Sequence, residues 1–322
     1  MQAQTFKVRV DALREEAHGV RSFSISRLDG MPFDAYEPGA HIDVTSPSGI
    51  TRQYSLCGDP ACRDSHVFAV KKEEQSRGGS RSLHDEVSIG SELSIGAPRN
   101  LFRLEESASE HILIGAGIGI TPLLSMAYRL VAIGAPFTLH YFARSDTHAA
   151  FLPLLARAPF DGHVRLHFGV EREVLADELD ACIRDADKDA HVYTCGPAPF
   201  MDVVVDTAQK RLPAGAIHLE RFKAEPQAPT DESLDTFDVQ LASTGQTVRV
   251  DAATSIVDAL ASIGIEVDTS CGEGVCGTCM VDVVSGEPEH RDHCLSKAER
   301  ASNSVICCCV SRSRSPVLVL DL

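Results

Sequence analysis

The chain has 322 residues, a net charge of −16 and 11 cysteines, a length that allows two or three domains. The acidic excess argues against a nucleic-acid partner, because phosphate binding requires clustered Lys and Arg, and no stretch has the ~18 uninterrupted apolar residues of a membrane span. Without a basic and then apolar N-terminal segment we expect a cytoplasmic protein, in which so many cysteines indicate metal or redox chemistry rather than disulfides.

The first segment, residues 1–105, consists of short runs of alternating hydrophobicity. Examples are FKVRV, HIDVTS, HVFAVK and SELSI, which are separated by Gly, Pro, Asp and Asn turns. Alternation with a period of two is typical of half-buried strands. We therefore predict an antiparallel β-barrel domain here, with a sandwich as the alternative.

The second segment, residues 106–225, alternates strands with helices. The apolar strand HILIGAG leads through a glycine turn into the helical stretch TPLLSMAYRLVAIG, and further strands follow at FTLHYFAR, VRLHFGV and HVYTCGP. Such alternation predicts an α/β domain with a doubly wound parallel sheet. The turn GAGIGITP has the strand-to-helix context of dinucleotide binding, although it is not the strict G-x-G-x-x-G sequence.

The third segment follows a polar, proline-bearing stretch that predicts a linker over residues 226–236. Over residues 237–322 we expect a compact α+β domain, in which FDVQLA and QTVRV form a hairpin around STG. Thr254 is the predicted N-cap of a short helix that ends near Gly264. Residues 231–322 hold 15 acidic and 6 basic side chains, a net charge of −9.

The sequence CGEGVCGTC places Cys271, Cys276 and Cys279 in a C-x4-C-x2-C pattern, and the run ICCCV offers a fourth cysteine. This is the spacing of plant-type 2Fe-2S ferredoxins. The interspersed glycines allow the positive φ values and close backbone approach that such a loop requires. Structural zinc usually needs two close pairs and this loop has one, while a glycine-rich loop is a poor place to bury cysteines as core residues.

Together, TSCGEGVCGTC and the terminal ICCCVSRSRSPVLVLDL resemble the C-terminal ferredoxin domain of phthalate dioxygenase reductase and its relatives, such as vanillate demethylase reductases. The resemblance covers nearly the whole chain and implies a β-grasp fold for residues 237–322. In the family the fourth ligand immediately precedes Val-Ser, which selects Cys309. On a strand Cys307 would point the same way and Cys308 the opposite way, so these two stay as alternatives. We expect Cys294 to be a bystander.

The resemblance also implies an FMN site in the barrel. Arg52-Gln53-Tyr54-Ser55 resembles the family's R-x-Y-S element, in which Arg pairs with phosphate, the aromatic ring packs on the flavin and the hydroxyl addresses flavin N5. RGGSRSL resembles its phosphate loop at a helix N-terminus. The residues implied to contact FMN are Arg52, Gln53, Tyr54, Ser55, Ala69, Val70, Lys71, Arg77, Gly78, Gly79, Ser80, Ser82 and Phe222.

Other interpretations of the flavin segment stay open. Arg52 could lie on a solvated strand face with Tyr54 in the core, and Phe222 could seal a domain interface. FAD is the alternative flavin. The single phosphate loop and the position of the ferredoxin domain at the end of the chain favour FMN.

The nicotinamide site is implied by two turns. GAGIGITP resembles the family's G-G-x-G-x-T-P turn, with Ala116 where glycine is usual, and Thr194-Cys195-Gly196-Pro197 resembles its Cys-Gly-Pro element. Asp146 beside Arg144 favours NADH, because an acidic side chain repels the 2′-phosphate of NADPH. The residues implied to contact NAD are Gly115, Gly117, Gly119, Thr121, Pro122, Arg144, Asp146, Cys195, Gly196 and Pro197.

The resemblance implies a monomeric, NADH-dependent reductase component of a two-component Rieske-type aromatic oxygenase or demethylase. Electrons would pass from NADH through FMN and the 2Fe-2S cluster to the oxygenase. No side-chain acid or base is required, and we expect Ser55, Thr121 and Cys195 to position the reacting rings. The alternatives are a stand-alone reductase for an acceptor such as a haem protein, and a non-catalytic metal or interaction module.

Overall fold

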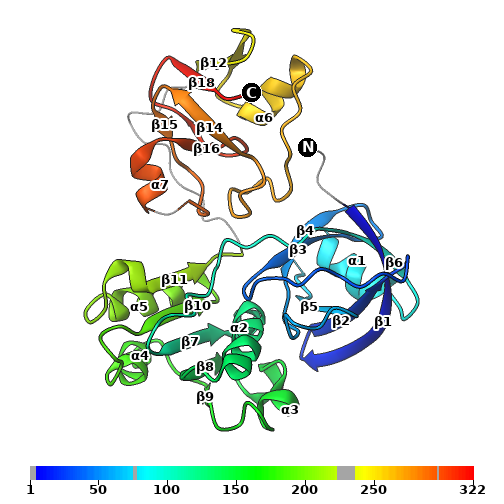
Figure 1. Ribbon diagram of the computed structural model, residues 1–322, viewed down its shortest axis with the longest axis vertical. Coiled ribbons are helices and arrows are strands. Elements are labelled where there is room, and N and C mark those ends of the chain that lie inside the picture. The colour runs from blue at the N-terminus through cyan, green and yellow to red at the C-terminus, as the bar shows by residue number, and fades with distance from the viewer. Residues whose placement is uncertain (1–4, 75–77, 223–235, 296) are drawn as a thin grey trace. The chain divides into compact units, whose positions relative to one another are not determined.

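The computed structural model of the chain describes residues 5–74, 78–222, 236–295 and 297–322, without the side chains of residues 297 and 298 (Figure 1). Arg77 and nearly all of the predicted linker lie outside these ranges. The chain divides into two compact units, of which one ends at Glu220 and the other begins at Arg221. Within the described ranges, no helix is both long and apolar enough to cross a membrane.

The first sheet is antiparallel and has six strands in the order β4-β3-β6-β1-β2-β5. The strands are β1 (Thr5–Ala17), β2 (Val20–Arg27), β3 (His41–Thr45), β4 (Thr51–Ser55), β5 (His66–Lys71) and β6 (Glu92–Gly96). Leu56, just after β4, bridges Phe68 on β5. This bridge joins the two ends of the strand order, so the sheet closes and the predicted barrel is confirmed.

The barrel interior follows from the alternating pattern. Val8 and Val10 on β1, like Phe23 and Ile25 on β2, are 0% exposed, whereas the residues between them, such as Arg9 and Ser24, are more exposed. The helix α1 (Gly79–Glu86) adds Leu83 to the same core.

The second sheet is wholly parallel, with the order β11-β10-β7-β8-β9. Its strands are β7 (His111–Ala116), β8 (Phe137–Ala143), β9 (Val164–Phe168), β10 (His191–Cys195) and β11 (Ile217–Glu220). The chain moves outward from β7 in one direction and then returns to add β10 on its other side. The carboxyl ends of β7 and β10 therefore form the switch point at which such sheets bind ligands.

Helices cover both faces of this sheet, as the doubly wound prediction requires. The α-helices are α2 (Ile120–Ile133), α3 (Leu152–Leu155), α4 (Leu175–Ile183) and α5 (Ala198–Ala208), and the 3-10 turns are η1 (Gly117–Gly119), η2 (Asp146–His148) and η3 (Ala214–Ala216). Leu113 packs with α2 on one face, whereas Ile112 and Ile114 pack with α4 and α5 on the other. The cluster around α2 also contains barrel residues such as Ala69 and Phe102, so the barrel and the sheet share one unit.

The second unit holds a five-stranded sheet in the order β13-β12-β18-β14-β16 and a two-stranded one, β15-β17. Its elements are β12 (Phe237–Leu241), β13 (Thr247–Val250), α6 (Ile256–Ser262), β14 (Met280–Ser285), β15 (Pro288–Glu289), α7 (Lys297–Ser302), β16 (Val305–Cys307), β17 (Arg312–Ser313) and β18 (Val317–Leu320). β12 pairs parallel with β18 and antiparallel with β13, which confirms the predicted hairpin and the ferredoxin-like arrangement.

One local prediction in this unit is wrong by a residue. The N-cap of α6 is Ser255 rather than Thr254, because the Ser255 hydroxyl accepts a hydrogen bond of 3.1 Å from the backbone N–H of Asp258. Ser and Thr cap helices by the same bond, so the two adjacent candidates could not be separated by residue type.

Candidate functional site

The turns that follow β7 and β10 touch one another. A Cβ placed on Gly119 would lie 2.1 Å from the carbonyl oxygen of Cys195, which no real side chain tolerates. The absence of a side chain at Gly119 is therefore what lets the two turns close together. The structure thus brings GAGIGITP and TCGP, both predicted to bind NAD, to one place.

Ala116, where the family pattern has glycine, fits this junction. Its φ of −126° is ordinary extended backbone, so the position does not require glycine. Its methyl group lies 3.0 Å from where a Cβ on Gly196 would be. The glycine that permits this close approach is therefore Gly196, on the opposite turn.

Tyr141 on β8 holds the first turn in shape. Its hydroxyl donates to the Gly117 carbonyl at 3.0 Å and accepts from the Ala150 N–H at 2.9 Å. Gly117 has a φ of 55°, and a Cβ there would face open space. The turn therefore presents unobstructed backbone of the kind that a dinucleotide phosphate approaches. Thr121 is turned inward, since its hydroxyl donates to the Ile118 carbonyl at 2.9 Å.

A carboxylate that the sequence analysis did not identify lies between the barrel and the sheet. Glu220 on β11 accepts a hydrogen bond of 3.2 Å from the Ser55 hydroxyl on β4. Its other oxygen lies 3.8 Å from Nδ1 of His41 on β3. Because β10 and β11 run parallel, Glu220 is also the strand partner of Cys195.

This grouping joins residues predicted for two different cofactors. Ser55 was assigned to the flavin and Cys195 to the nicotinamide, and Glu220 contacts the first and neighbours the second. The Cys195 side chain is fully buried, and its thiol pKa is raised well above the usual value by burial and then by the Glu220 charge. Cys195 is therefore a neutral thiol and a packing surface, not a thiolate nucleophile.

The predicted flavin residues on β4 lie beside the N-terminus of α1. A Cβ on Gly79 would lie 3.5 Å from Cγ of Arg52, so the Arg52 stem runs alongside the start of the helix. Gly78 caps the helix with a φ of 108°, a conformation that favours glycine. Tyr54 stacks obliquely on Phe68 with ring centroids 5.6 Å apart, and burial raises its pKa to about 12.

Two serines of the predicted phosphate loop make hydrogen bonds to neighbouring backbone. The Ser82 hydroxyl accepts from the Ser48 N–H at 3.1 Å, and the Ser80 hydroxyl accepts from the Glu73 N–H at 3.2 Å. These serines therefore connect α1 to the neighbouring loops.

The five other residues predicted to contact the flavin lie on the barrel wall, at the end of β5 or in the other unit. Gln53 donates to Asp43 at 2.5 Å, and Asp43 pairs with Arg99 at 2.9 Å, so Gln53 belongs to a network on the barrel wall. The backbone of Ala69, Val70 and Lys71 forms the end of β5. Phe222 belongs to the other unit and is 38% exposed; its role at the flavin stays a prediction.

Arg144 and Asp146 follow β8 at the same carboxyl edge of the parallel sheet, and both are exposed. The Asp146 carboxylate accepts from the Thr147 N–H at 2.7 Å, which fixes it at the start of η2. The structure therefore leaves the acidic group at the surface next to the only cation in the YFARSD stretch.

The cysteines of the loop converge in the second unit. Cys271, Cys276 and Cys279 are at most 5% exposed. The thiols of Cys271 and Cys276 are within hydrogen-bonding reach, and the Cys309 thiol reaches both Cys271 and Cys279. Hydrogen bonds from Cys307 and then Cys309 lower the pKa of the Cys279 thiol to about 4. The Glu273 N–H donates to the Cys271 sulfur at 3.2 Å.

The loop glycines have the predicted conformation, with φ values of 67°, 72° and 66° at positions 272, 274 and 277. Gly274 shows why. A Cβ there would lie 2.6 Å from a methyl of Val310 and 3.0 Å from Cα of Asp292. The His293 N–H also donates to the Gly274 carbonyl at 2.8 Å. The loop is therefore folded tightly against two other segments.

Residues 307 to 309 do not lie on one strand, so the condition under which Cys307 would point the same way as Cys309 is not met. β16 ends at Cys307, and the next residues form a turn in which the Ser311 N–H bonds to the Cys307 carbonyl at 3.1 Å. The turn lets both Cys307 and Cys309 approach Cys279. Cys307 also lies 3.1 Å from the sulfur of Cys294, while the pKa of the fully buried Cys308 thiol is raised by burial.

Comparison with known proteins agrees with this geometry. Residues 239–314 match the family described as the 2Fe-2S iron-sulfur cluster binding domain. The chain is 41% identical to the vanillate O-demethylase oxidoreductase of Pseudomonas sp. (strain HR199 / DSM 7063), over 98% of this chain and 99% of that protein. It therefore belongs to the phthalate dioxygenase reductase and vanillate O-demethylase oxidoreductase family.

The solved structure of phthalate dioxygenase reductase, described as transferring electrons from pyridine nucleotides to a 2Fe-2S centre, has a TM-score of 0.72 and 35% identity to this chain, covering 99% of this chain and 98% of that one. An intact type IV self-sufficient cytochrome P450 monooxygenase has a TM-score of 0.88 and 34% identity over 99% of this chain, which spans 41% of that protein. As a member of the phthalate dioxygenase reductase family, the chain is an NAD(P)H-dependent flavin and 2Fe-2S oxidoreductase of the reductase-subunit type.

Proposed function

We propose that the chain is the NADH-dependent reductase component of a two-component Rieske-type oxygenase or demethylase that acts on aromatic compounds, with FMN as its flavin. The observation that carries this proposal is the end-to-end alignment with a vanillate O-demethylase oxidoreductase. Such an alignment leaves no part of the relative without a counterpart here. In the two-component system proposed here, the oxygen-activating partner would be a separate protein.

The residues around the switch point fit a bound nicotinamide and flavin. When bound, FMN would accept a hydride from NADH and pass the electrons on singly. Glu220 accepts the proton of the Ser55 hydroxyl in a hydrogen bond of 3.2 Å, so Ser55 would face the flavin with its oxygen. Cys195 and Thr121, which are buried, would fix the nicotinamide position by packing. Gly117 and Gly119 would let the dinucleotide backbone approach.

The cysteine loop fits a 2Fe-2S cluster. We assign Cys271, Cys276, Cys279 and Cys309 as its ligands. This choice is supported by the position of the Cys309 sulfur, which reaches both Cys271 and Cys279 across the loop. The Cys307 thiol is within hydrogen-bonding reach of Cys279, but it also contacts the Cys294 thiol, which is not a proposed ligand. Backbone N–H groups such as that of Glu273 supply hydrogen bonds that tune iron–sulfur centres.

The partner is expected to present a basic face. Residues 231–322 carry a net charge of −9, so electrostatic steering would speed association and would weaken as salt screens it. We expect rising ionic strength to slow electron delivery to the oxygenase and to leave NADH oxidation by ferricyanide nearly unchanged. Equal salt sensitivity of the two reactions would contradict the acidic docking surface.

The direct test is reconstitution with a vanillate-type Rieske oxygenase. The full-length chain should support NADH-dependent product formation, and the Cys309→Ser variant should lose it while it keeps NADH–ferricyanide activity. A chain that reduces ferricyanide but no Rieske oxygenase would contradict the proposed partner class. FMN rather than FAD is checked by releasing the flavin and separating it by chromatography.

A second acceptor class has its own supporting observation. The likeness to the self-sufficient cytochrome P450 extends over 99% of this chain, so the same three-sheet arrangement occurs joined to a haem protein. A stand-alone reductase that serves a separate haem protein would use the same internal residues. Faster reduction of a P450 haem domain than of a Rieske oxygenase, at equal acceptor concentration, would favour this alternative.

A further inference from the structure

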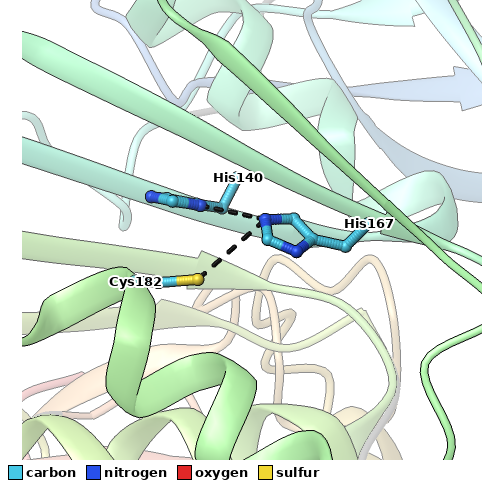
Figure 2. A group of neighbouring side chains, drawn as sticks. All are labelled: His140, His167 and Cys182. Atoms are coloured by element: carbon cyan, nitrogen blue, oxygen red, sulfur yellow. Dashed lines mark hydrogen bonds between the residues drawn. The ribbon is translucent and has the colours of Figure 1, made fainter.

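Three metal-ligating side chains that the electron-transfer scheme does not use come together in the first unit (Figure 2). His140 lies on β8, His167 on β9 and Cys182 on α4. Nδ1 of His140 is 3.0 Å from Nε2 of His167, and the Cys182 sulfur is 4.0 Å from the same Nε2. The three ligand atoms all lie within 4.8 Å of one another.

The protonation states of the two histidines suit metal binding, whereas Cys182 must lose a proton, because burial and then the Glu178 charge raise the pKa of its thiol to about 12. Burial, followed by the charges of His167 and Arg165, lowers the pKa of His140 to about 4. Burial also lowers the pKa of His167. Both imidazoles are therefore neutral near pH 7 and have lone pairs to offer. In the hydrogen bond between the two rings one ligand nitrogen donates its proton to the lone pair of the other, so the donor ring must shift that proton to its second nitrogen before both can bind an ion.

The rings are held in place by packing. Phe142 stacks on His167 with ring centroids 4.2 Å apart and an angle of 7° between the planes. His140 is 9% exposed. Side chains fixed in this way lose little freedom when they bind an ion, which favours tight binding.

The distances between the three ligand atoms suit a tetrahedral zinc ion after small movements of the side chains. Ligands at ~2.0 to 2.3 Å from zinc are about 3.3 to 3.8 Å apart along the edges of the tetrahedron. The observed separations, from 3.0 Å to no more than 4.8 Å, bracket this range. Side-chain shifts of about an ångström, of the size that a ligand induces, are sufficient.

A carboxylate stands behind one of the histidines. Glu178 lies one helical turn before Cys182 on α4, and its Oε2 is 3.7 Å from Nδ1 of His167. That nitrogen is on the side of the ring opposite Nε2, which faces the other two ligands. Histidines that bind metals usually direct their second nitrogen at such a group, which orients the ring and raises its basicity.

We propose that His140, His167 and Cys182 bind one zinc ion that joins β8 and β9 to α4. Two imidazole nitrogens and one thiolate sulfur are ligands that zinc favours, and water completes the tetrahedron. On binding, the Cys182 thiol releases its proton to solvent and its sulfur forms a bond to the ion, while the proton shared by His140 and His167 moves to the second nitrogen of the donor ring. No oxidant or reductant is needed. The ion stabilises the folded α/β domain because the unfolded chain lacks the assembled ligands.

The same sheet offers a matched control. Nδ1 of His191 is 2.9 Å from Nε2 of His218, and these two rings are stacked, whereas those of His140 and His167 are tilted. Within the described ranges this pair belongs to no group of three ligands. It therefore separates the effect of a histidine pair from that of a pair with a thiol.

The test uses the full-length protein with its flavin and cluster. The protein is equilibrated with excess Zn²⁺ and desalted, and its zinc and iron are counted by elemental mass spectrometry. We expect the wild type to retain one zinc per chain with its iron unchanged. Cys182→Ser should weaken zinc binding by more than about 100-fold and Glu178→Gln by about 10- to 100-fold, the usual loss when an outer partner is removed.

His191→Gln and Cys62→Ser serve as controls and should bind zinc as the wild type does. Unchanged flavin and iron contents show that each variant is folded. If Cys182→Ser loses flavin or iron, the zinc affinity of Glu178→Gln alone tests the proposal, because Glu178 is partly exposed and its substitution should not disturb the fold.

The ligands themselves are read from zinc K-edge X-ray absorption, which iron does not obscure. One sulfur and two imidazoles support the site. A zinc shell made only of sulfur would place the ion in the cysteine loop, and this result overturns the proposal. A wild type that retains no zinc, or a Cys182→Ser variant that binds it normally, overturns the proposal equally.

Discussion

The cysteine loop and the switch-point site are built in opposite ways. Three of the four proposed cluster ligands fall within nine consecutive residues. At the switch point, by contrast, Ser55 and Glu220 are 165 residues apart in the chain and meet only because the barrel packs on the parallel sheet. The positions of the three loop cysteines are therefore set by one glycine-rich segment. The switch point is a product of the whole first unit, so damage to the two should have different consequences.

The largest effect is expected from a ligand of the loop. Cys276→Ser should abolish the cluster and lower NADH–cytochrome c activity by more than about 100-fold, since even outer partners of metal ligands are worth 10- to 100-fold. NADH–ferricyanide activity should remain, because the flavin lies upstream. Iron analysis and the two assays check this.

Cys308→Ser is the matched control for the loop. Cys308 is fully buried but takes no part in the proposed ligand set, so its variant should keep its iron. Loss of iron from this variant and retention by Cys276→Ser would reverse our assignment.

The next effect concerns the junction of the two turns. Gly119→Ala places a methyl group 2.1 Å from the Cys195 carbonyl oxygen, so the turns must separate, at a cost of about 1 to 3 kcal/mol in the free energy of unfolding. NADH should also bind more weakly. Denaturant unfolding and the KM for NADH measure both changes.

Gly162→Ala is the control for the junction, since a Cβ there has open space around it. It should leave stability and KM nearly unchanged. Equal effects of the two substitutions would show that the contact at Gly119 is not the cause.

A smaller effect is expected at the contact between barrel and sheet. Ser55→Ala removes the hydroxyl that donates to Glu220. Hydrogen bonds to charged groups are worth about 1.5 to 3 kcal/mol, so flavin reduction by NADH should slow by about 10- to 100-fold in stopped-flow measurements. Ser94→Ala, on the outer wall of the barrel, is the comparison. An unchanged rate in Ser55→Ala would remove Ser55 from the positioning role.

The smallest effect is expected at the exposed edge of the sheet. Asp146→Asn removes a negative charge where we expect the adenosine ribose. Two unit charges ~4 Å apart in water interact by about 1 kcal/mol, so the KM for NADPH should fall about fivefold and the KM for NADH should change little. Asp161→Asn, a similarly exposed position in the same unit, should alter neither value.

The same contrast explains what the sequence could predict. The positive φ values at the loop glycines and the strand-to-helix turn after β7 are local, and both were predictable from residue types. Glu220 was not. Its role depends on the register that places it beside Cys195 and on the packing that brings Ser55 to it, and no spacing in the chain encodes that.

The local prediction that failed, the N-cap of α6, did so because two neighbours were chemically equivalent. Thr254 and Ser255 can make the same cap, and three successive cysteines can each bind iron. The choice among these cysteines stays a prediction, and it depends on the turn after Cys307, where Val310 packs against Gly274. The proposed zinc ligands are a further instance of tertiary assembly, because 27 residues separate His140 from His167 and 15 separate His167 from Cys182.

Paramagnetic resonance of the iron pair tests the central claim most directly. Without air, NADH is added to the wild type, Cys307→Ser and Cys309→Ser. We predict the signal of a half-reduced 2Fe-2S cluster in the wild type and in Cys307→Ser, and none in Cys309→Ser. A wild type that gives no signal after NADH addition, or a signal that survives in Cys309→Ser and disappears in Cys307→Ser, would contradict the account.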